Sequence, residues 1–113
     1  MRYMLMICDD ESDSRGPLDI VRDPEHVAWI DYLDSKGITF LDGVRLRPST
    51  DATTVRSRNG ETLVSDGPFV ESKEQVGGFA LIECDHLDDA IEAAARHPFA
   101  AHGVVEVRPA WDE

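Results

Sequence analysis

Apolar residues follow two kinds of pattern along the chain, one typical of buried strands and one typical of helices. The runs Arg2–Cys8 and Gly78–Cys84 are apolar at successive positions, which indicates strands covered on both faces. The segments Ile38–Leu46 and Gly103–Val107 predict two more strands, the first of them irregular at Gly43. A sheet of four main strands is therefore expected.

Two segments have the spacing of helices. The first begins at Asp23-Pro24, where aspartate suits the N-cap and proline suits the first helical position, and it ends at Lys36-Gly37. The second covers residues 85–97 and stops before Pro98. The apolar positions expected to face the core are Val27, Ile30 and Leu33 with Trp29 beside them, and Leu87, Ala90, Ile91 and Ala94.

Two short strands, Thr53–Ser57 and Glu61–Ser65, flank Asn59-Gly60, the strongest hairpin signal in the chain. The complete order is βαββαβ with an extra hairpin, which predicts a ferredoxin-like α+β fold. Residues 1–113 are expected to form a single domain of this kind. Two helices cover only one face of such a sheet, yet its strands are apolar on both faces. A second copy of the chain is therefore predicted to cover the open face in a homodimer.

Residues 66–79 read DGPFVESKEQVGGF and hold the densest set of conformationally special residues. Asp66-Gly67-Pro68 is typical of a turn, because aspartate bonds its own backbone, glycine permits positive φ and proline fixes φ. Glu71 and Lys73 follow the turn, and Gly77-Gly78 then lets the backbone pass close to a neighbour. The segment combines a turn, charged side chains and the start of a strand.

Charge narrows the choice of partners. The formal net charge is −12, whereas the apolar share of 42% and the charged share of 30% are ordinary. This charge argues against nucleic acid and against an anionic membrane surface as partners, and no apolar run reaches the ~20 residues of a membrane span. Cys8 and Cys84 lie far apart without metal or redox spacing, so we expect reduced thiols in a cytoplasmic protein, with no metal site and no cofactor. The acidic stretch 9–19 is expected to be a solvated loop.

Five stretches, in order, resemble the DGPF branch of the YCII-related family, a branch named after the residues at 66–69. They are RYMLMIC at 2–8, GVRLRPS at 43–49, DATTVR at 51–56, DGPFVESKEQVGGFALIE at 66–83 and LDDAIEAAARHPFAAHGVVEVRPAW at 87–111. The resemblance implies a dimeric α+β barrel. It also implies a link to sigma factors of the extracytoplasmic-function group, beside which such proteins are often encoded. In the wider family a histidine near the start of the first helix and an aspartate are proposed as a catalytic pair, and His26 resembles that histidine.

His26 and Asp66 are the candidate catalytic residues. His26 lies in the first turn of its helix, where the helix dipole disfavours the imidazolium and keeps the ring neutral as a base. Asp66 would orient one ring nitrogen and leave the other for a substrate proton. Two plainer roles stay open: His26 bonding Asp23 or water, and Asp66 satisfying only its own turn.

The candidate substrate-binding residues are Arg47, Arg56, Phe69, Glu71 and Lys73. The two arginines flank a proline bend and would clamp a carboxylate through paired donors. The phenylalanine would add apolar lining, and the glutamate and lysine would line the mouth of a pocket. The plainer alternatives are arginines that neutralise the many acids, and a surface ion pair that contributes ~0–1 kcal/mol.

Two functions stay open on this evidence. The first is a small enzyme or binder for a carboxylated or aromatic molecule, with His26 and Asp66 transferring protons as in an isomerase or an elimination lyase. The second is a non-catalytic dimeric module that acts through a protein partner linked to sigma-factor regulation. One pocket lined by both residues would favour the first function, and a solvent-facing His26 would favour the second. The aromatic residues expected to line a pocket, or else to fill the core, are Trp29, Tyr32, Phe40, Phe69 and Phe79.

Overall fold

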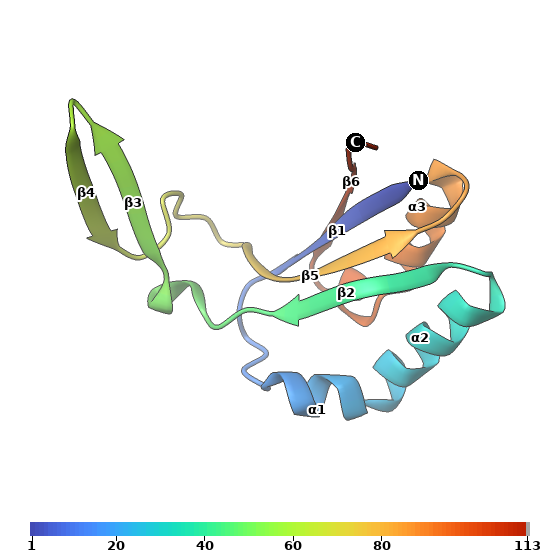
Figure 1. The fold of residues 1–113 in the computed structure, drawn as a ribbon. Coiled ribbons are helices and arrows are strands. Elements are labelled where there is room, and N and C mark those ends of the chain that lie inside the picture. The colour runs from blue at the N-terminus through green and yellow to red at the C-terminus, as the bar shows by residue number, and fades with distance from the viewer. Residues whose placement is uncertain (113) are drawn as a thin grey trace.

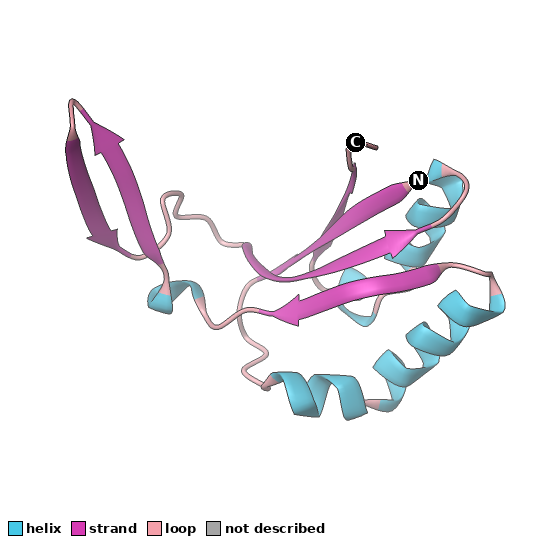
Figure 2. Ribbon diagram, viewed as in Figure 1, coloured by secondary structure: helices cyan, strands magenta, loops and turns pink. Residues whose placement is uncertain are grey.

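The computed structural model describes residues 1–112 and shows an α+β fold. Figure 1 shows the elements in chain order, and Figure 2 shows the same view coloured by type. The elements are β1 (Arg2–Asp9), α1 (Pro17–Arg22), α2 (Pro24–Ser35), β2 (Thr39–Arg45), the 3₁₀ turn η1 (Ser49–Asp51), β3 (Thr53–Arg58), β4 (Glu61–Asp66), β5 (Gln75–Glu83), α3 (Leu87–Ala95), the 3₁₀ turn η2 (Pro98–Ala101) and β6 (Val104–Pro109).

The main sheet has four antiparallel strands in the order β2-β5-β1-β6. This order, with a helix after the first strand and another after the third strand of the sheet, confirms the predicted ferredoxin-like arrangement. Strands β3 and β4 pair only with each other and form a separate hairpin. Figure 1 shows this hairpin standing away from the main sheet. We call β3, β4 and the turn between them the arm.

The local signals read from the sequence account for the element boundaries. Asp23 is the N-cap of α2, and its Oδ1 accepts a hydrogen bond from the Glu25 N–H at 2.8 Å. Gly37 follows the helix with φ of 68°, the left-handed conformation that ends many helices. At the tip of the arm, Asn59 and Gly60 have φ of 53° and 78°, as a two-residue hairpin turn requires.

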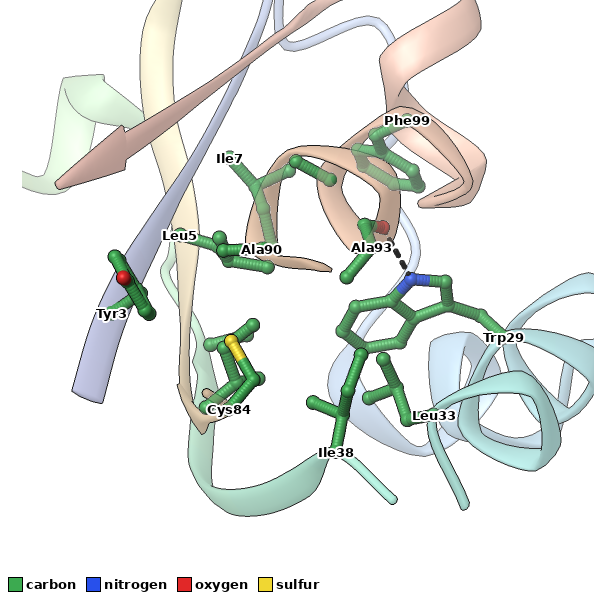
Figure 3. Packing of buried hydrophobic residues seen from close by; sticks show 13 residues of the cluster. Tyr3, Leu5, Ile7, Trp29, Leu33, Ile38, Cys84, Ala90, Ala93 and Phe99 are labelled. Carbon is green, nitrogen blue, oxygen red and sulfur yellow. Dashed lines mark hydrogen bonds between the residues drawn. The ribbon is translucent and has the colours of Figure 1, made fainter. Parts of the chain in front are cut away.

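The core lies between one face of the main sheet and the helices α2 and α3. Leu5, Leu33 and Ile82 are fully buried there. Trp29 joins the two helices, because its Nε1–H donates a 2.8 Å hydrogen bond to the Ala93 carbonyl (Figure 3). Its indole is only 3% exposed, so the bond satisfies a buried donor.

Several predicted details of the helices are wrong. The stretch expected to be a loop contains α1, which begins directly after Gly16 with Pro17 at its first position. The second predicted helix is shorter than expected, and residues after it form η2. Val27, Leu87 and Ile91, expected to face the core, are about half exposed at 46%, 48% and 49%. The buried stripes are instead made by Trp29 and Leu33, and by Ala90, Ala93 and Ala94.

The second face of the main sheet is uncovered in the single chain. Along β1, residues alternate between buried and half-buried positions, so Met4, Met6 and Cys8 lie on the open face. Their neighbours in β5, Leu81 opposite Met4 and Phe79 opposite Met6, are half buried as well. This face thus has an apolar strip along β1 and β5, with Glu106 and Arg108 of β6 beside it opposite Met6 and Met4, and no helix of residues 1–112 covers it.

Candidate functional site

A cavity of about 250 Å³ lies between α1, α2 and the helix-covered face of the main sheet. Its walls are mostly apolar, and the polar groups in them come from three elements or their edges: His26 of α2, Arg45 of β2 and His97 just before η2. The principal apolar wall residues are Ile7, Ile20, Trp29, Ile30, Phe40 and Phe99. A hollow of this kind, with few polar groups, is typical of a small-molecule site.

His26 occupies the third helical position of α2 and lines the cavity with a half-buried side chain. Burial lowers its pKa, while the nearby charge of Asp23 opposes that shift. Asp23 itself is engaged elsewhere, as the N-cap and as the partner of Arg15 at 2.6 Å. The ring of His26 is therefore neutral at pH 7 and has a lone pair to offer within the cavity.

His97 is the second histidine of the cavity and is only 7% exposed. Burial lowers its pKa to about 4, with a smaller contribution from His26, so this ring is also neutral. Its Nδ1 accepts a 3.1 Å hydrogen bond from the Phe99 N–H. Because one nitrogen of a neutral imidazole carries the hydrogen and the other accepts, the hydrogen lies on Nε2. His97 therefore presents a hydrogen-bond donor.

The two imidazoles lie at one end of an aromatic cluster. Their ring centroids are 6.5 Å apart, and Trp29 packs against both, at 6.0 Å from His26 and 4.8 Å from His97. Phe40 meets Trp29 edge to face at 6.3 Å. These contacts fix the ring positions, since each ring is held by packing on a neighbour from another element.

Arg45 lies where this cavity adjoins a second, more polar hollow of about 150 Å³. Its Nη2 donates to the Asp13 carbonyl at 2.6 Å and its Nε to the Arg15 carbonyl at 3.3 Å, while the guanidinium lies 5.5 Å from the Phe99 ring centre. The side chain thus fastens the loop before α1 to the sheet. Pro17, Arg45 and Gly77 belong to the walls of both hollows.

Asp9, at the end of β1, is the unusual group of the second hollow. It is only 2% exposed, its Oδ1 accepts the Glu11 N–H at 2.9 Å, and its Oδ2 has no hydrogen-bond partner within residues 1–112. A side chain at Gly77 would place its Cβ 3.0 Å from Nη1 of Arg45 and 3.9 Å from Oδ1 of Asp9. Glycine at this position therefore allows the carboxylate and the guanidinium to approach the same backbone.

The acidic stretch before α1 is held in place rather than solvated throughout. The Glu11 carboxylate accepts hydrogen bonds from the Ser49 N–H at 2.6 Å and the Ser49 hydroxyl at 2.7 Å. Arg15 bridges Asp13 and Asp23, and the bond to Arg15 holds the pKa of Asp13 at about 2. These contacts shape the wall of the second hollow.

The structure does not bring Asp66 to His26 within one chain. Asp66 ends β4, pairs in register with Thr53, and is exposed. It lines neither the cavity nor the second hollow. The turn after it is closed by the arm itself, through the Gly67 N–H to the Ala52 carbonyl at 2.7 Å.

The predicted substrate-binding residues also lie outside the cavity. Arg47 pairs with Asp51 at 2.9 Å and its side chain is 85% exposed. Phe69 is 76% exposed, and Arg56 lies beside it in an open depression of the arm. Glu71 and Lys73 are exposed in the loop between β4 and β5. Of the seven candidate residues, the cavity contains His26 alone.

Three residues of the candidate site were not singled out from the sequence, namely Asp9, Arg45 and His97. Of the aromatic residues proposed as lining, Trp29 and Phe40 line the cavity and Tyr32 and Phe69 do not, whereas Phe79 borders it from a strand position whose side chain lies on the open face. His97 had one local signal, its position before Pro98 at the end of a helix. Its meeting with His26 depends on the packing of α2 against α3, to which no local pattern points.

Within residues 1–112, His, Cys, Asp and Glu side chains form no group of three or more that could hold a metal ion. The helices of that same range are too short or too polar to cross a membrane.

Comparison with known proteins places the chain in a family. The family model described as the YCII-related domain matches residues 1–113, the whole chain. The chain is also 51% identical over 67 residues to an uncharacterized protein of Rhizobium meliloti (strain 1021). That match covers 58% of this chain and 54% of the relative, so the chain spans about half the length of the relative it matches. The match along its full length shows that this chain belongs to the YCII-related domain family.

Proposed function

We propose that the protein binds a small, largely apolar or aromatic molecule in the cavity of His26 and His97 and transfers a proton on it. The observation that carries this proposal is the pairing of a neutral histidine with a buried histidine donor in one apolar hollow. His26 supplies a base, and His97 supplies a hydrogen-bond donor for an oxygen of the bound molecule. These two groups suit an isomerisation or an elimination.

The geometry supports a division of roles between the two rings. His26 takes a proton from the bound molecule, because its pKa lies below the usual value and its ring is neutral at pH 7. The electron pair left on the molecule shifts toward an oxygen, and the Nε2–H of His97 stabilises the negative charge that develops there. His26 then returns the proton at a different atom, as in an isomerase, or a leaving group departs, as in a lyase.

Asp66 enters this proposal with a smaller role than the sequence suggested. Within one chain it is exposed at the end of β4 and lines no wall of the cavity. The buried carboxylate at the wall of the adjoining hollow is Asp9, on a strand that also supplies Ile7 to the cavity. We expect Asp9, which accepts the Glu11 N–H, to position the loop before α1 and therefore the wall of the adjoining hollow.

The protein is further proposed to act as a homodimer joined through the open face of the main sheet. Met4, Met6, Phe79 and Leu81 form an apolar strip on that face, and such a strip gains free energy when a second copy covers it. Changing Met6 to Glu places a charge within the strip and should convert a dimer to a monomer in sedimentation, while Ala28→Glu, which adds the same charge at an exposed position of α2, should not.

The experiment that tests the cavity is a ligand screen with matched variants. Small phenols and aromatic carboxylates are screened by thermal shift against the wild type, His26→Gln, His97→Gln and the exposed His86→Asn. Hits should lose about tenfold or more in affinity in the first two variants, as expected when a hydrogen bond to a buried group is lost, and keep it in the third. Hits that bind all four proteins equally would contradict the site.

A second function is favoured by one observation, namely that two apolar residues of the DGPF segment, Phe69 and Val70, are exposed. Phe69 at 76% and Val70 at 52% lie on the surface beside Arg56 and Lys73. This suits a non-catalytic dimeric module that binds a protein partner linked to sigma-factor regulation, without contact to DNA because of the charge of −12. Under this function, Phe69→Ala would abolish partner binding and His26→Gln would have no effect.

A further inference from the structure

Among the helices and strands of residues 1–112, none is packed along the arm formed by β3 and β4. All of β4 and five of the six residues of β3 are exposed, and β3 and β4 pair only with each other. The radius of gyration is 15.8 Å, whereas a compact domain of this length has about 13 Å. An isolated two-stranded hairpin is marginally stable in water. We therefore expect the arm to be stabilised by packing against another surface.

The two faces of the arm differ in character. Register places Val55 opposite Val64 and Ser57 opposite Thr62, so these residues share one face, which we call face A. The opposite face B contains Arg56 and Arg58, with Leu63 opposite Arg56 and Glu61 opposite Arg58. Val55 and Val64 are 61% and 64% exposed. Face A thus has two valines and a single charged residue, Asp66 at its base, whereas face B has three charged residues and one leucine, so face A is the better suited to packing.

Charge favours a copy of this chain as the partner. Two arginines balance Glu61 and Asp66 in the arm, so its net charge is zero and the full −12 lies on the rest of the chain. Arg56 and Arg58 form no ion pair within residues 1–112, although Arg15, Arg47, Arg96 and Arg108 all do. A neutral arm is not repelled by the strongly acidic body of a second copy, whereas any other part of the chain carries the excess negative charge.

Geometry favours a copy seated on the open face of the main sheet. In Figure 1 the arm rises on the side of the sheet away from α1 and α2. The open face, which these helices do not cover, lies on that same side. A second copy covering Met4, Met6, Phe79 and Leu81 would therefore lie within reach of the arm. A two-fold relation would place both arms in the same way, each on the other copy.

We infer that each arm lies with face A against the second copy of the chain and clasps the dimer. This inference rests on the proposed homodimer and adds to it a second contact outside the sheet-to-sheet interface. The arm then contributes apolar area from Val55 and Val64, while Arg56 and Arg58 on face B point away from this contact.

The test compares substitutions on the two faces of the arm. Sedimentation equilibrium measures the dimer dissociation constant of the wild type, of Val55→Glu with Val64→Glu on face A, and of Leu63→Glu with Ser65→Glu on face B. Both double variants add the same charge, and neither touches the cavity. The face A variant should raise the constant about tenfold or more, and the face B variant by less than about threefold, because only face A loses buried apolar area.

Hydrogen exchange of the wild type gives a second readout. Amides of Thr53–Arg58 and Glu61–Asp66 should gain protection as the protein concentration is raised through the dimer dissociation constant. A dimer whose constant is insensitive to face A, or whose arm protection does not change with concentration, would overturn the clasp and leave the sheet-to-sheet dimer standing. A wild type that stays monomeric would overturn both proposals.

Discussion

The cavity region and the arm contain the two residues predicted to act together, yet they are built in different ways. His26 lies where α1, α2, β2, β5 and η2 converge. Its ring contacts Trp29 of the same helix and His97, and those two rings also pack on each other. Asp66 lies at the base of a hairpin that has cross-strand contacts alone. The comparison teaches that a dense sequence motif does not by itself mark a closed site, since closure depends on elements that meet from distant parts of the chain.

The largest expected difference between the two regions is in stability. Trp29→Ala removes a 3% exposed side chain and leaves the Ala93 carbonyl without its partner, which should lower the free energy of unfolding by about 3–5 kcal/mol. Phe69→Ala removes a ring that is 76% exposed and should change that free energy by less than about 0.5 kcal/mol. Urea unfolding at a fixed protein concentration measures both. Equal losses would show that the arm side of the molecule is packed as tightly as the cavity.

The second expected difference is in the response to acid. The pKa of His97 is about 4 in the folded protein and 6.5 when unperturbed, so the unfolded chain binds more protons between these values. Stability should therefore fall as the pH drops from 6.5 to about 4, by on the order of 3 kcal/mol from this group, and His26 should add to the fall. Asp13, whose pKa is about 2, acts only below this window.

The variant His97→Gln isolates that contribution. Its unfolding free energy should vary much less between pH 6.5 and 4 than that of the wild type, whereas the exposed His86→Asn should keep the full slope. Denaturant titrations at half-unit pH steps give the comparison. A slope that survives in His97→Gln would mean that other groups, not the buried histidine of the cavity, control the acid response.

The sequence predicts an element of the fold well when the signal for that element lies within a few neighbouring residues. Asp23-Pro24 starts a helix and Asn59-Gly60 turns a hairpin because the chemistry lies within a few residues, and the structure confirms both. The βαββαβ order then determines the sheet. The start of α1 at Pro17 was missed because Gly-Pro within an acidic stretch resembles a loop.

The candidate site was predicted only in part, because its residues are distant in sequence. His26 was found from its position in a helix, which is a local property. His97 joins it through the contact of α2 with α3, and Arg45 joins through the register of β2 on β5. Asp9 became conspicuous only when its burial and its unbonded oxygen were known. Partners of this kind follow from the three-dimensional arrangement and have no signature along the chain.

The smallest expected effect is a local loss of stability in the arm when Gly60 is replaced. Gly60 has φ of 78°, so Gly60→Ala forces a side chain into the left-handed region at a cost of roughly 1–2 kcal/mol. Because the arm contacts little of the body, this cost should fall on the arm alone. Amides of β3 and β4 should exchange faster with solvent, while those of β1 keep their protection. Asn59→Gly serves as the control, because glycine adopts the positive φ of this position without strain. It should leave the exchange rates of the β3, β4 and β1 amides unchanged. If β1 loses protection by the same factor as the arm, then the arm folds as one unit with the body, and the division between a packed site and a free-standing hairpin is wrong.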